Sequence, residues 1–180
     1  MRRPQTKDLA IYALVILAGV QLSVLGVRMT HPDQVPLVWP QVDDTISGVR
    51  IHLSNDRETQ LPSGDPTVLL IFDSQCVHCA EVAPLWKDWL RAEGRDWRVL
   101  AVAAECLESA QRYAEEQGWE VQVGAVEAEP SGEMAAALTG RAPWVFVANG
   151  AGVILAEGHG DMLPELINGV EPHANWLPVP

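Results

Sequence analysis

Continuous apolar runs alternate with stretches of helical spacing along residues 45–170 of the chain. Four runs are apolar almost throughout, as is typical of buried strands: residues 68–72, 97–103, 121–126 and 144–147. Three stretches carry apolar residues on one helical face or end in a helix stop signal: residues 80–90, 109–117 and 132–139. Gly118 and Gly140 follow the last two stretches and predict where those helices end. This order predicts an α/β fold in which a mixed sheet lies between helices.

One apolar stretch near the N-terminus is longer than an ordinary element of a globular domain. Leu9–Val27 holds 19 residues without a charge, with three basic residues before it and Arg28 after it. At about 1.5 Å per residue, a helix of this length spans roughly 28 Å, close to the thickness of a hydrocarbon core. The excess of basic residues before it predicts a cytoplasmic N-terminus and an exported C-terminal part. We therefore expect residues 1–28 to be a cytoplasmic stub and signal anchor.

A cleaved signal peptide is the alternative for the same segment. Its apolar core would be Leu9–Val20, and Val24–Gly26 would supply the small-residue cleavage site, although no Ala-x-Ala is present. The apolar run is longer than is usual for a signal peptide, which favours the uncleaved anchor. Either interpretation places the rest of the chain in an extracytoplasmic compartment, where disulfides persist.

Prolines mark the stretch that follows the anchor. Pro32, Pro36 and Pro40 predict a short, semi-rigid linker over residues 29–44. The 180-residue chain is 48% hydrophobic, enough for one good core, so residues 45–180 are expected to form a single domain. From Met29 on, 23 acidic residues face 8 basic ones, which makes nucleic acid and anionic lipid surfaces unsuitable partners.

A C-x-x-C motif, Cys76 to Cys79, stands between the apolar run 68–72 and the helical stretch 80–90. The first sulfur is expected beside the unpaired amides of a helix N-terminus, whose positive field favours the thiolate, and the thiolate is the species that attacks a disulfide. The second sulfur, one turn later, can close the ring and expel the product. The motif therefore predicts reversible disulfide chemistry, with Cys76 as nucleophile and Cys79 as resolving thiol.

Two other uses of a C-x-x-C motif find less support in the chain. A four-ligand zinc site needs a second pair of ligands, but Cys106 is the only other cysteine and the four histidines outside the motif lack ligand spacing. A structural disulfide without turnover is the other alternative, and a ring this small is often strained and labile. We expect Cys106 to be a buried, inert thiol rather than a third redox group.

Two prolines extend the pattern beyond the cysteines. Pro84 lies in the helical stretch five residues after Cys79, where it should kink the helix. Ala142-Pro143 immediately precedes the late apolar run. This order of strand, C-x-x-C, helix proline and X-Pro before a late strand resembles the thioredoxin superfamily. The resemblance implies a thioredoxin-like three-layer α/β fold with a mixed central sheet, and it puts Pro143 in the place of the family's cis-proline beside the active site.

Within this superfamily the chain is similar to the membrane-anchored TlpA/ResA branch. The matching features are an N-terminal hairpin at 47–53 and 58–61, a strand–helix–strand insert from 99 to 126, a turn at Asn149-Gly150, and Gly158 where the family opens the final turn before the last helix. Three residues depart from the superfamily pattern. Leu70 replaces the buried aspartate of thioredoxin, Gln75 replaces the usual tryptophan, and Val77 replaces the glycine or proline usual inside the motif. These changes are expected to alter redox poise and partner fit without removing the dithiol chemistry.

His78 stands between the two cysteines and bears on the direction of the chemistry. A donor or partial positive charge a few ångströms from a thiolate stabilises the reduced form and makes the disulfide more oxidising. The oxidase DsbA also has histidine at this position, whereas the TlpA/ResA branch is mostly reductive. The sequence leaves the direction open.

The resemblance further implies a glutamate that assists proton transfer near the end of the strand that begins at Val99. Counting back from the helix that contains Tyr113 places Glu105 at that position. Counting forward from Ala101 instead places that position one residue away from Glu105. Because the two counts disagree, Glu108 is the alternative.

The sequence as a whole predicts a single-pass, membrane-tethered thiol–disulfide oxidoreductase with its catalytic domain in the periplasm or at the cell surface. Its partners would be protein thiols or disulfides and a redox partner, and no dissociable cofactor is needed. A module that carries copper or another soft metal on the dithiol is the alternative, because soft ions prefer thiolates. Peroxidase chemistry is disfavoured because Asp73 stands where a peroxidatic motif would have threonine.

Overall fold

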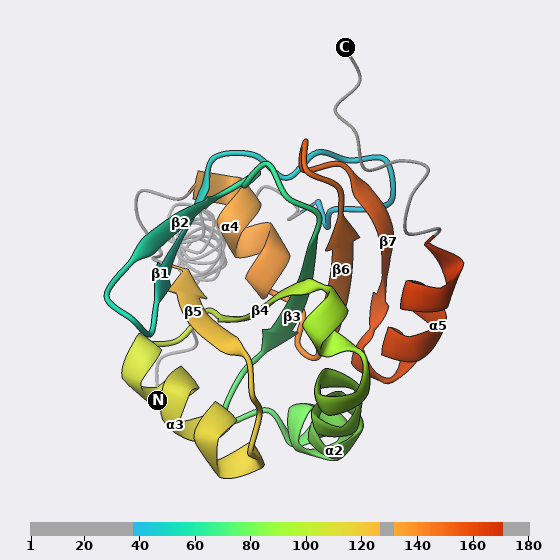
Figure 1. Ribbon diagram of the computed structural model, residues 1–180. Coiled ribbons are helices and arrows are strands. Elements are labelled where there is room, and N and C mark those ends of the chain that lie inside the picture. Colours follow the sequence, from blue (N-terminus) through green and yellow to red (C-terminus); the bar gives the residue numbers. More distant parts are fainter. Residues whose placement is uncertain (1–37, 127–131, 171–180) are drawn as a thin grey trace, which may run out of the picture. The chain divides into compact units, whose positions relative to one another are not determined.

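The structure is a computed structural model that describes residues 38–126 and 132–170. Within these residues the strands form one seven-stranded sheet in the order β2-β1-β5-β4-β3-β6-β7 (Figure 1). The strands are β1 (Val49–Leu53), β2 (Glu58–Leu61), β3 (Thr67–Phe72), β4 (Arg98–Ala103), β5 (Gln122–Val126), β6 (Trp144–Ala148) and β7 (Ile154–His159). The central strands β3, β4 and β5 run parallel, and the other neighbouring pairs are antiparallel. The predicted mixed sheet and the N-terminal hairpin are both confirmed.

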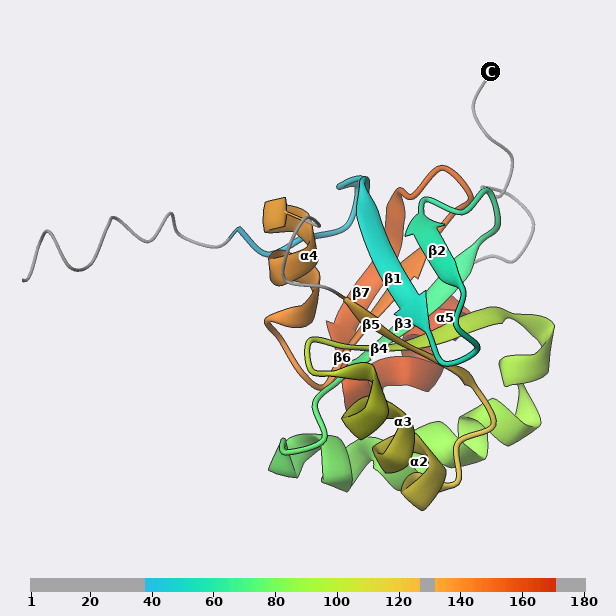
Figure 2. The same cartoon turned by 90° about the vertical axis from the view of Figure 1, so that its left-hand side faces the viewer.

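Helices cover both faces of this sheet. They are α2 (Val77–Ala92), α3 (Leu107–Gln117), α4 (Gly132–Thr139) and α5 (Leu163–Gly169), with the short 3-10 helices η1 (Gly94–Asp96) and η2 (Gly160–Met162). Figure 1 shows α2 between α3 and α5, and Figure 2 shows α4 on the other side of the sheet from α2 and α3. The protein therefore has three layers, as expected, with the helix that follows the cysteine motif on the more heavily covered face.

The alternation of side chains along β3 divides the interior into two cores. Val68, Leu70 and Phe72 point into a core shared with α2, α3 and α5. Leu69 and Ile71 point into a second core, shared with β1 and α4. All six residues of β3 are buried, which explains why this run is continuously apolar in the sequence. Each fully buried aliphatic or aromatic side chain contributes about 1.5–3 kcal/mol, so β3 anchors the loop that leads to the cysteines.

The helices begin and end close to the predicted positions. α2 begins at Val77, with Cys76 as its N-cap, and it contains Pro84 as predicted. α3 begins two residues earlier than predicted, with Cys106 as its N-cap. It ends at Gly118, whose φ of 70° lies in the left-handed region that favours glycine and whose N–H bonds back to the carbonyl groups of the last turn.

The glycine that opens the final turn is Gly160, so the prediction of Gly158 is wrong. Gly158 lies inside β7, paired with Val145 of β6. Gly160 begins η2, and a Cβ there would lie 2.8 Å from the Trp86 ring and 2.9 Å from Pro143. The chain must pass close to both residues at this point, which leaves no space for a side chain.

The predicted anchor at residues 9–27, and the alternative of a cleaved signal peptide, lie outside the described residues. No helix in residues 38–126 or 132–170 is long and apolar enough to cross a membrane. The end of the predicted linker is described, and it hydrogen-bonds to the domain. The Asp43 N–H donates to the Ile154 carbonyl at 2.9 Å, and the Ile154 N–H donates to the Asp44 carbonyl at 2.9 Å.

Candidate active site

Cys76 lies where the chain passes from β3 into α2. It is the N-cap residue of α2, with extended backbone angles, and its N–H donates to the Asp73 carbonyl at 3.1 Å. Its side chain is half-buried, and the thiol lies 3.5 Å from the carbonyl oxygen of Ala142. The first turn of α2 contains no acidic residue, so no negative side chain in that turn opposes the positive field of the helix N-terminus. The structure thus places Cys76 as the sequence predicts.

Cys79 lies one turn later and is fully buried. Burial, together with a hydrogen bond to Cys76 and the negative charge of that neighbour, raises the pKa of the Cys79 thiol to about 12, although the backbone N–H of Asp73 acts in the opposite direction. Both cysteines are free thiols in the structure. The site therefore combines one accessible sulfur with one that stays protonated.

Pro143 lies beside Cys76, as the resemblance implies. The Ala142–Pro143 peptide bond is cis, and the Pro143 side chain is buried. Two hydrogen bonds fix the segment behind it: the Gly160 N–H donates to the Pro143 carbonyl at 3.2 Å, and Trp86 Nε1 donates to the Gly160 carbonyl at 2.7 Å. Because Trp86 belongs to α2, the helix that carries the cysteines also positions the proline loop.

Arg141, which precedes the proline loop by one residue, contacts two tryptophan rings. Arg141 lies over the ring of Trp39 at 4.7 Å and over the ring of Trp144 at 4.8 Å. Trp144 Nε1 donates to Glu157 at 2.7 Å. A cation over an aromatic ring is attracted by the electron-rich face of that ring. Trp39, in the predicted linker, thus packs against the loop that precedes Pro143.

Glu105 lies at the site, while Glu108 does not. The parallel register pairs Phe72 with Ala103, so the residues two positions beyond each strand end, Ser74 and Glu105, come together. Ser74 donates from its N–H to Oε1 of Glu105 at 2.7 Å and from its hydroxyl to Oε2 at 2.6 Å. Glu108 is exposed and bonds to Arg112 at 2.8 Å. Glu105 therefore fixes the loop that leads to Cys76.

His78 is 71% exposed, and its hydrogen-bond partner in the described structure is Glu81. The Nδ1 atom lies 3.0 Å from the Glu81 carboxylate, one turn further along α2. The structure therefore pairs the imidazole with a carboxylate rather than with either sulfur. Val77, the other residue between the cysteines, is also 71% exposed and presents an apolar surface beside Cys76.

Cys106 is exposed, so the prediction of a buried thiol is wrong. β4 ends at Ala103, three residues earlier, and Cys106 has already left the sheet to cap α3. A hydrogen bond with the Ser109 hydroxyl, 3.2 Å away, lowers the pKa of Cys106. No group of three or more histidine, cysteine or acidic side chains suited to holding a metal ion occurs in the described part of the chain.

Ser74 and Tyr113 also belong to the site, and sequence reasoning did not single them out. Ser74 follows the strand by two residues, and a polar residue there could have been matched with Glu105 once parallel pairing of the strands was assumed. Tyr113 is buried on α3, with its ring packed against Phe72 and Trp119. In the sequence it reads only as an apolar position of a helix.

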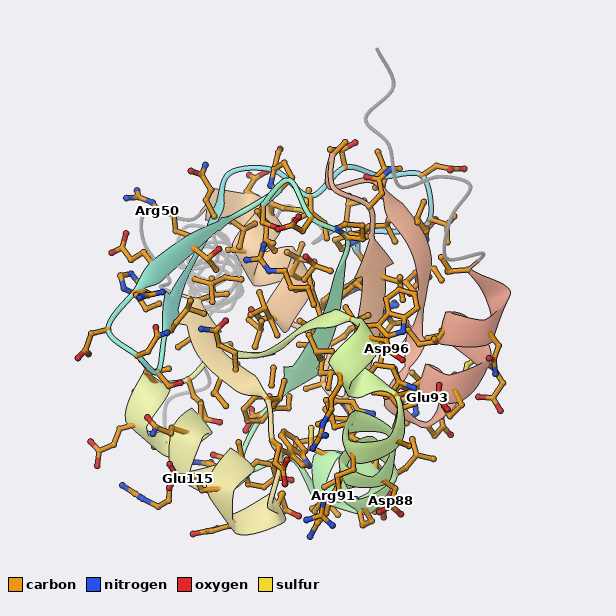
Figure 3. All side chains as sticks on the ribbon, in the orientation of Figure 1. Arg50, Asp88, Arg91, Glu93, Asp96 and Glu115 are labelled. Carbon is orange, nitrogen blue, oxygen red and sulfur yellow. The ribbon has the colours of Figure 1, made fainter. Side chains whose placement is uncertain are left out.

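The charged side chains at the C-terminal end of α2 lie away from the cysteines. Figure 3 shows Asp88, Arg91 and Glu93 at the C-terminal end of this helix, with Glu115 on the neighbouring α3. Asp88 is twelve residues after Cys76, about 18 Å along the helix. Nearer to Cys76 in the chain are Asp73, the His78–Glu81 pair and the exposed Val77, and the Ala142 carbonyl lies 3.5 Å from the Cys76 sulfur.

No family model and no curated protein sequence matches the chain. Its fold is similar to that of solved structures. The thioredoxin domain of a thiol-disulfide oxidoreductase from Bacteroides vulgatus aligns with a TM-score of 0.60 and 12% identity over 72% of this chain and 96% of that one. A peroxiredoxin-like protein from Aquifex aeolicus aligns with a TM-score of 0.58 and 12% identity, over 74% of this chain and 90% of that one. A candidate thiol:disulfide interchange protein DsbE from Chlorobium tepidum aligns with a TM-score of 0.55 and 17% identity, over 73% of this chain and 97% of that one. The chain has a thioredoxin-like fold, and the predicted fold class is confirmed for the described domain.

Proposed function

We propose that this protein is a thiol–disulfide oxidoreductase that acts on protein substrates, with Cys76 as nucleophile and Cys79 as resolving thiol. The contrast between the two sulfurs supports the proposal most directly. Cys76 is half-buried at the start of α2, whereas Cys79 is fully buried with a pKa raised to about 12 by that burial. Since a thiolate must reach its target to attack it, Cys76 is the sulfur that a client disulfide meets first.

The exchange proceeds in two balanced steps. In the reductive direction the Cys76 thiolate attacks one sulfur of the client disulfide, and the other client sulfur leaves as a thiolate and takes up a proton. Cys79 then loses its proton and attacks Cys76, which releases the first client sulfur and leaves a disulfide between the two cysteines. Two electrons pass from the protein to the client. The reverse sequence oxidises a client dithiol, and in either direction a redox partner restores the starting state.

The client would lie across Cys76 and the proline loop. The Ala142 carbonyl is 3.5 Å from the Cys76 sulfur, so a backbone N–H of an extended client segment can pair with this loop while the client sulfur meets Cys76. The exposed Val77, next to Cys76 in the chain, offers an apolar contact. Backbone pairing gives affinity with little sequence preference, which suits an enzyme that acts on protein chains.

Glu105 is the proposed proton acceptor for Cys79. Leu70, at the position of thioredoxin's aspartate, is completely buried among apolar side chains and carries no proton. Glu105 is held by both hydrogen bonds from Ser74, and each of its oxygens keeps a second lone pair that can accept a proton. Its charge is also felt by Tyr113 beside the cysteines.

We further propose that residues 9–27 tether the domain to a membrane, with the site on the extracytoplasmic side. This rests on the uncharged 19-residue run and on the basic residues before it. An oxidising compartment would suit a protein whose substrates are disulfides. Fractionation of cells that express the full chain, followed by protease treatment of intact cells, tests both the tether and its orientation.

Reduction of insulin by the reduced protein, in the presence of a small dithiol, tests the catalytic proposal. The parent should precipitate insulin B chains far faster than the dithiol alone, and Cys76→Ser should return the rate to that background. The metal content of the purified protein is measured alongside. Stoichiometric copper without insulin turnover would establish the soft-metal module instead.

A redox titration of Cys76 and Cys79 against glutathione decides the direction. A potential near that of thioredoxin, about −270 mV, would assign a reductase, and one near that of DsbA, about −120 mV, would assign an oxidase. The pairing of His78 with Glu81 favours the reductive direction, because the imidazole is engaged away from the sulfurs.

A further inference from the structure

The Tyr113 hydroxyl is a buried polar group without a partner. Among the buried side-chain nitrogen and oxygen atoms of residues 38–126 and 132–170, it is the one that makes no hydrogen bond. The residue is 8% exposed. Buried hydroxyl groups almost always have a partner, and an exception beside a reactive centre calls for a physical reason.

The ring of Tyr113 is fixed in place by its neighbours. It stacks on Phe72 with centroids 5.6 Å apart and planes 19° from parallel, and it meets Trp119 edge-on at 5.6 Å. Trp119 is itself held by a hydrogen bond from its Nε1 to the Ala83 carbonyl at 3.2 Å. Because Phe72 is the last residue of β3, this cluster lies directly beside the loop that leads to Cys76. The hydroxyl cannot turn to solvent without dismantling the cluster.

Tyr113 and Cys79 belong to the same buried core cluster, and Cys76 packs against that cluster. Burial, followed by the negative charges of Cys79, Cys76 and Glu105, raises the pKa of Tyr113 to about 12. The hydroxyl therefore stays protonated at every pH at which thiol exchange proceeds, and it can act as a donor. The other titratable group that acts on this centre is Asp73, which opposes ionisation of Cys79 by its charge.

We propose that the Tyr113 hydroxyl donates a hydrogen bond to the Cys79 sulfur when that sulfur becomes a thiolate, in the step that resolves the mixed disulfide. The inference rests on the proposed function. In that step Cys79 gives its proton to Glu105, the thiolate attacks Cys76, and the bond from Cys76 to the client sulfur breaks. The client leaves as a thiolate and takes up a proton. In the reduced protein Cys79 is a neutral thiol, so the Tyr113 hydroxyl has no thiolate to which it can donate.

Release of thionitrobenzoate from an aromatic disulfide, Ellman's reagent, separates the two steps in a Cys106→Ser background. Attack by Cys76 releases the first equivalent and leaves a mixed disulfide, and attack by Cys79 releases the second. Tyr113→Phe keeps the ring and removes only the hydroxyl. The second release should slow by about tenfold near neutral pH, as expected for the loss of a hydrogen bond to a charged group, and its pH profile should move to higher pH. The first release should change less than about twofold.

Phe72→Leu is the matched control, because it disturbs the same ring stack and keeps the hydroxyl. It should lower the melting temperature more than Tyr113→Phe does and slow the second release less. The inference is overturned if Tyr113→Phe and its parent release the second equivalent at equal rates between about pH 6 and 9, or if both releases slow alike. If the parent releases a single equivalent, Cys79 does not resolve the mixed disulfide, and the proposed function fails together with the inference.

Discussion

Two helices of this domain begin in the same way and are equipped for different chemistry. α2 follows β3 and has Cys76 as its N-cap, and α3 follows the neighbouring parallel strand β4 and has Cys106 as its N-cap. Neither cysteine makes a side-chain capping hydrogen bond, and both have extended backbone angles. The local backbone therefore gives both sulfurs the same position at a helix N-terminus.

The difference lies in what surrounds each sulfur. Three residues after Cys76 comes a second, buried thiol, and the Ala142 carbonyl of the proline loop lies 3.5 Å from Cys76. Three residues after Cys106 comes Ser109, whose hydroxyl bonds the sulfur, and the thiol is exposed. A thiol at a helix N-terminus is thus one part of a redox site. In the proposed function, the resolving thiol and the surface proposed to receive a client complete it.

Removing the resolving thiol, which Cys76 has and Cys106 lacks, should have the largest effect on turnover. Cys79→Ser leaves Cys76 able to attack but unable to release a client, so insulin turnover should fall by at least about 100-fold and mixed disulfides should accumulate on non-reducing gels. Cys106→Ser is the matched control, and its turnover should stay within about twofold of the parent. Equal losses in the two variants would mean that Cys106 takes part in the cycle.

Giving α3 the same thiol spacing tests whether that spacing alone is enough for insulin turnover. In a Cys76→Ser, Cys79→Ser background, Ser109→Cys should allow a disulfide between Cys106 and the introduced thiol, detected as the loss of two hydrogens by mass spectrometry. Insulin turnover should nevertheless stay below about 1% of the parent, because the Ala142–Pro143 loop lies beside Cys76. Restored turnover would show that the surface around Cys76 contributes little.

Weakening the two hydrogen bonds between Ser74 and Glu105 should have an intermediate effect. Glu105→Gln weakens two hydrogen bonds to a charged group and removes the proposed proton acceptor, so the free energy of unfolding should fall by about 1–2 kcal/mol and turnover by about tenfold. Glu108→Gln removes an exposed pair with Arg112 and should change both by little. Denaturant titrations and insulin assays of the two variants measure these changes. If Glu105→Gln and Glu108→Gln had the same stability and turnover, Glu105 would have no part in the mechanism.

Alkylation across pH should distinguish Cys106 from Cys79. The hydrogen bond with Ser109 lowers the pKa of Cys106, whereas burial raises that of Cys79 to about 12, so Cys106 should react at lower pH and Cys79 should resist iodoacetamide throughout. Ser109→Ala removes the bond that stabilises the thiolate and should move labelling of Cys106 to higher pH. Mass mapping of labelled peptides provides the readout, and fast labelling of Cys79 would contradict the assignment.

The smallest effect is expected at His78. Since its imidazole pairs with Glu81 on an exposed surface, His78→Val should make the potential more negative by at most about 20 mV. Glu81→Gln frees the imidazole and should move the potential in the opposite direction if the ring then turns to Cys76. Glutathione titrations of the two variants measure this, and a shift of about 60 mV or more in His78→Val would show that the imidazole acts on the thiolate.

Much of the fold followed from the sequence because hydrophobic periodicity is a local property. The run at 68–72 is apolar throughout because both of its faces are covered, and Gly118 ends a helix through its own backbone. The C-x-x-C spacing places two sulfurs one helical turn apart whatever surrounds them. The position of Glu105 was reached as well, although only the structure distinguished it from Glu108.

Contacts between distant segments were decided by the tertiary structure alone. Ser74 meets Glu105 because two parallel strands pair in one register, and Gly160 rather than Gly158 opens the last turn because the chain passes there between Trp86 and Pro143. The exposure of Cys106 depends on where β4 ends. Such features depend on packing between elements, and no pattern along one segment encodes them. The sequence by itself determined the order of elements and the dithiol, and the packed fold decided what each sulfur faces.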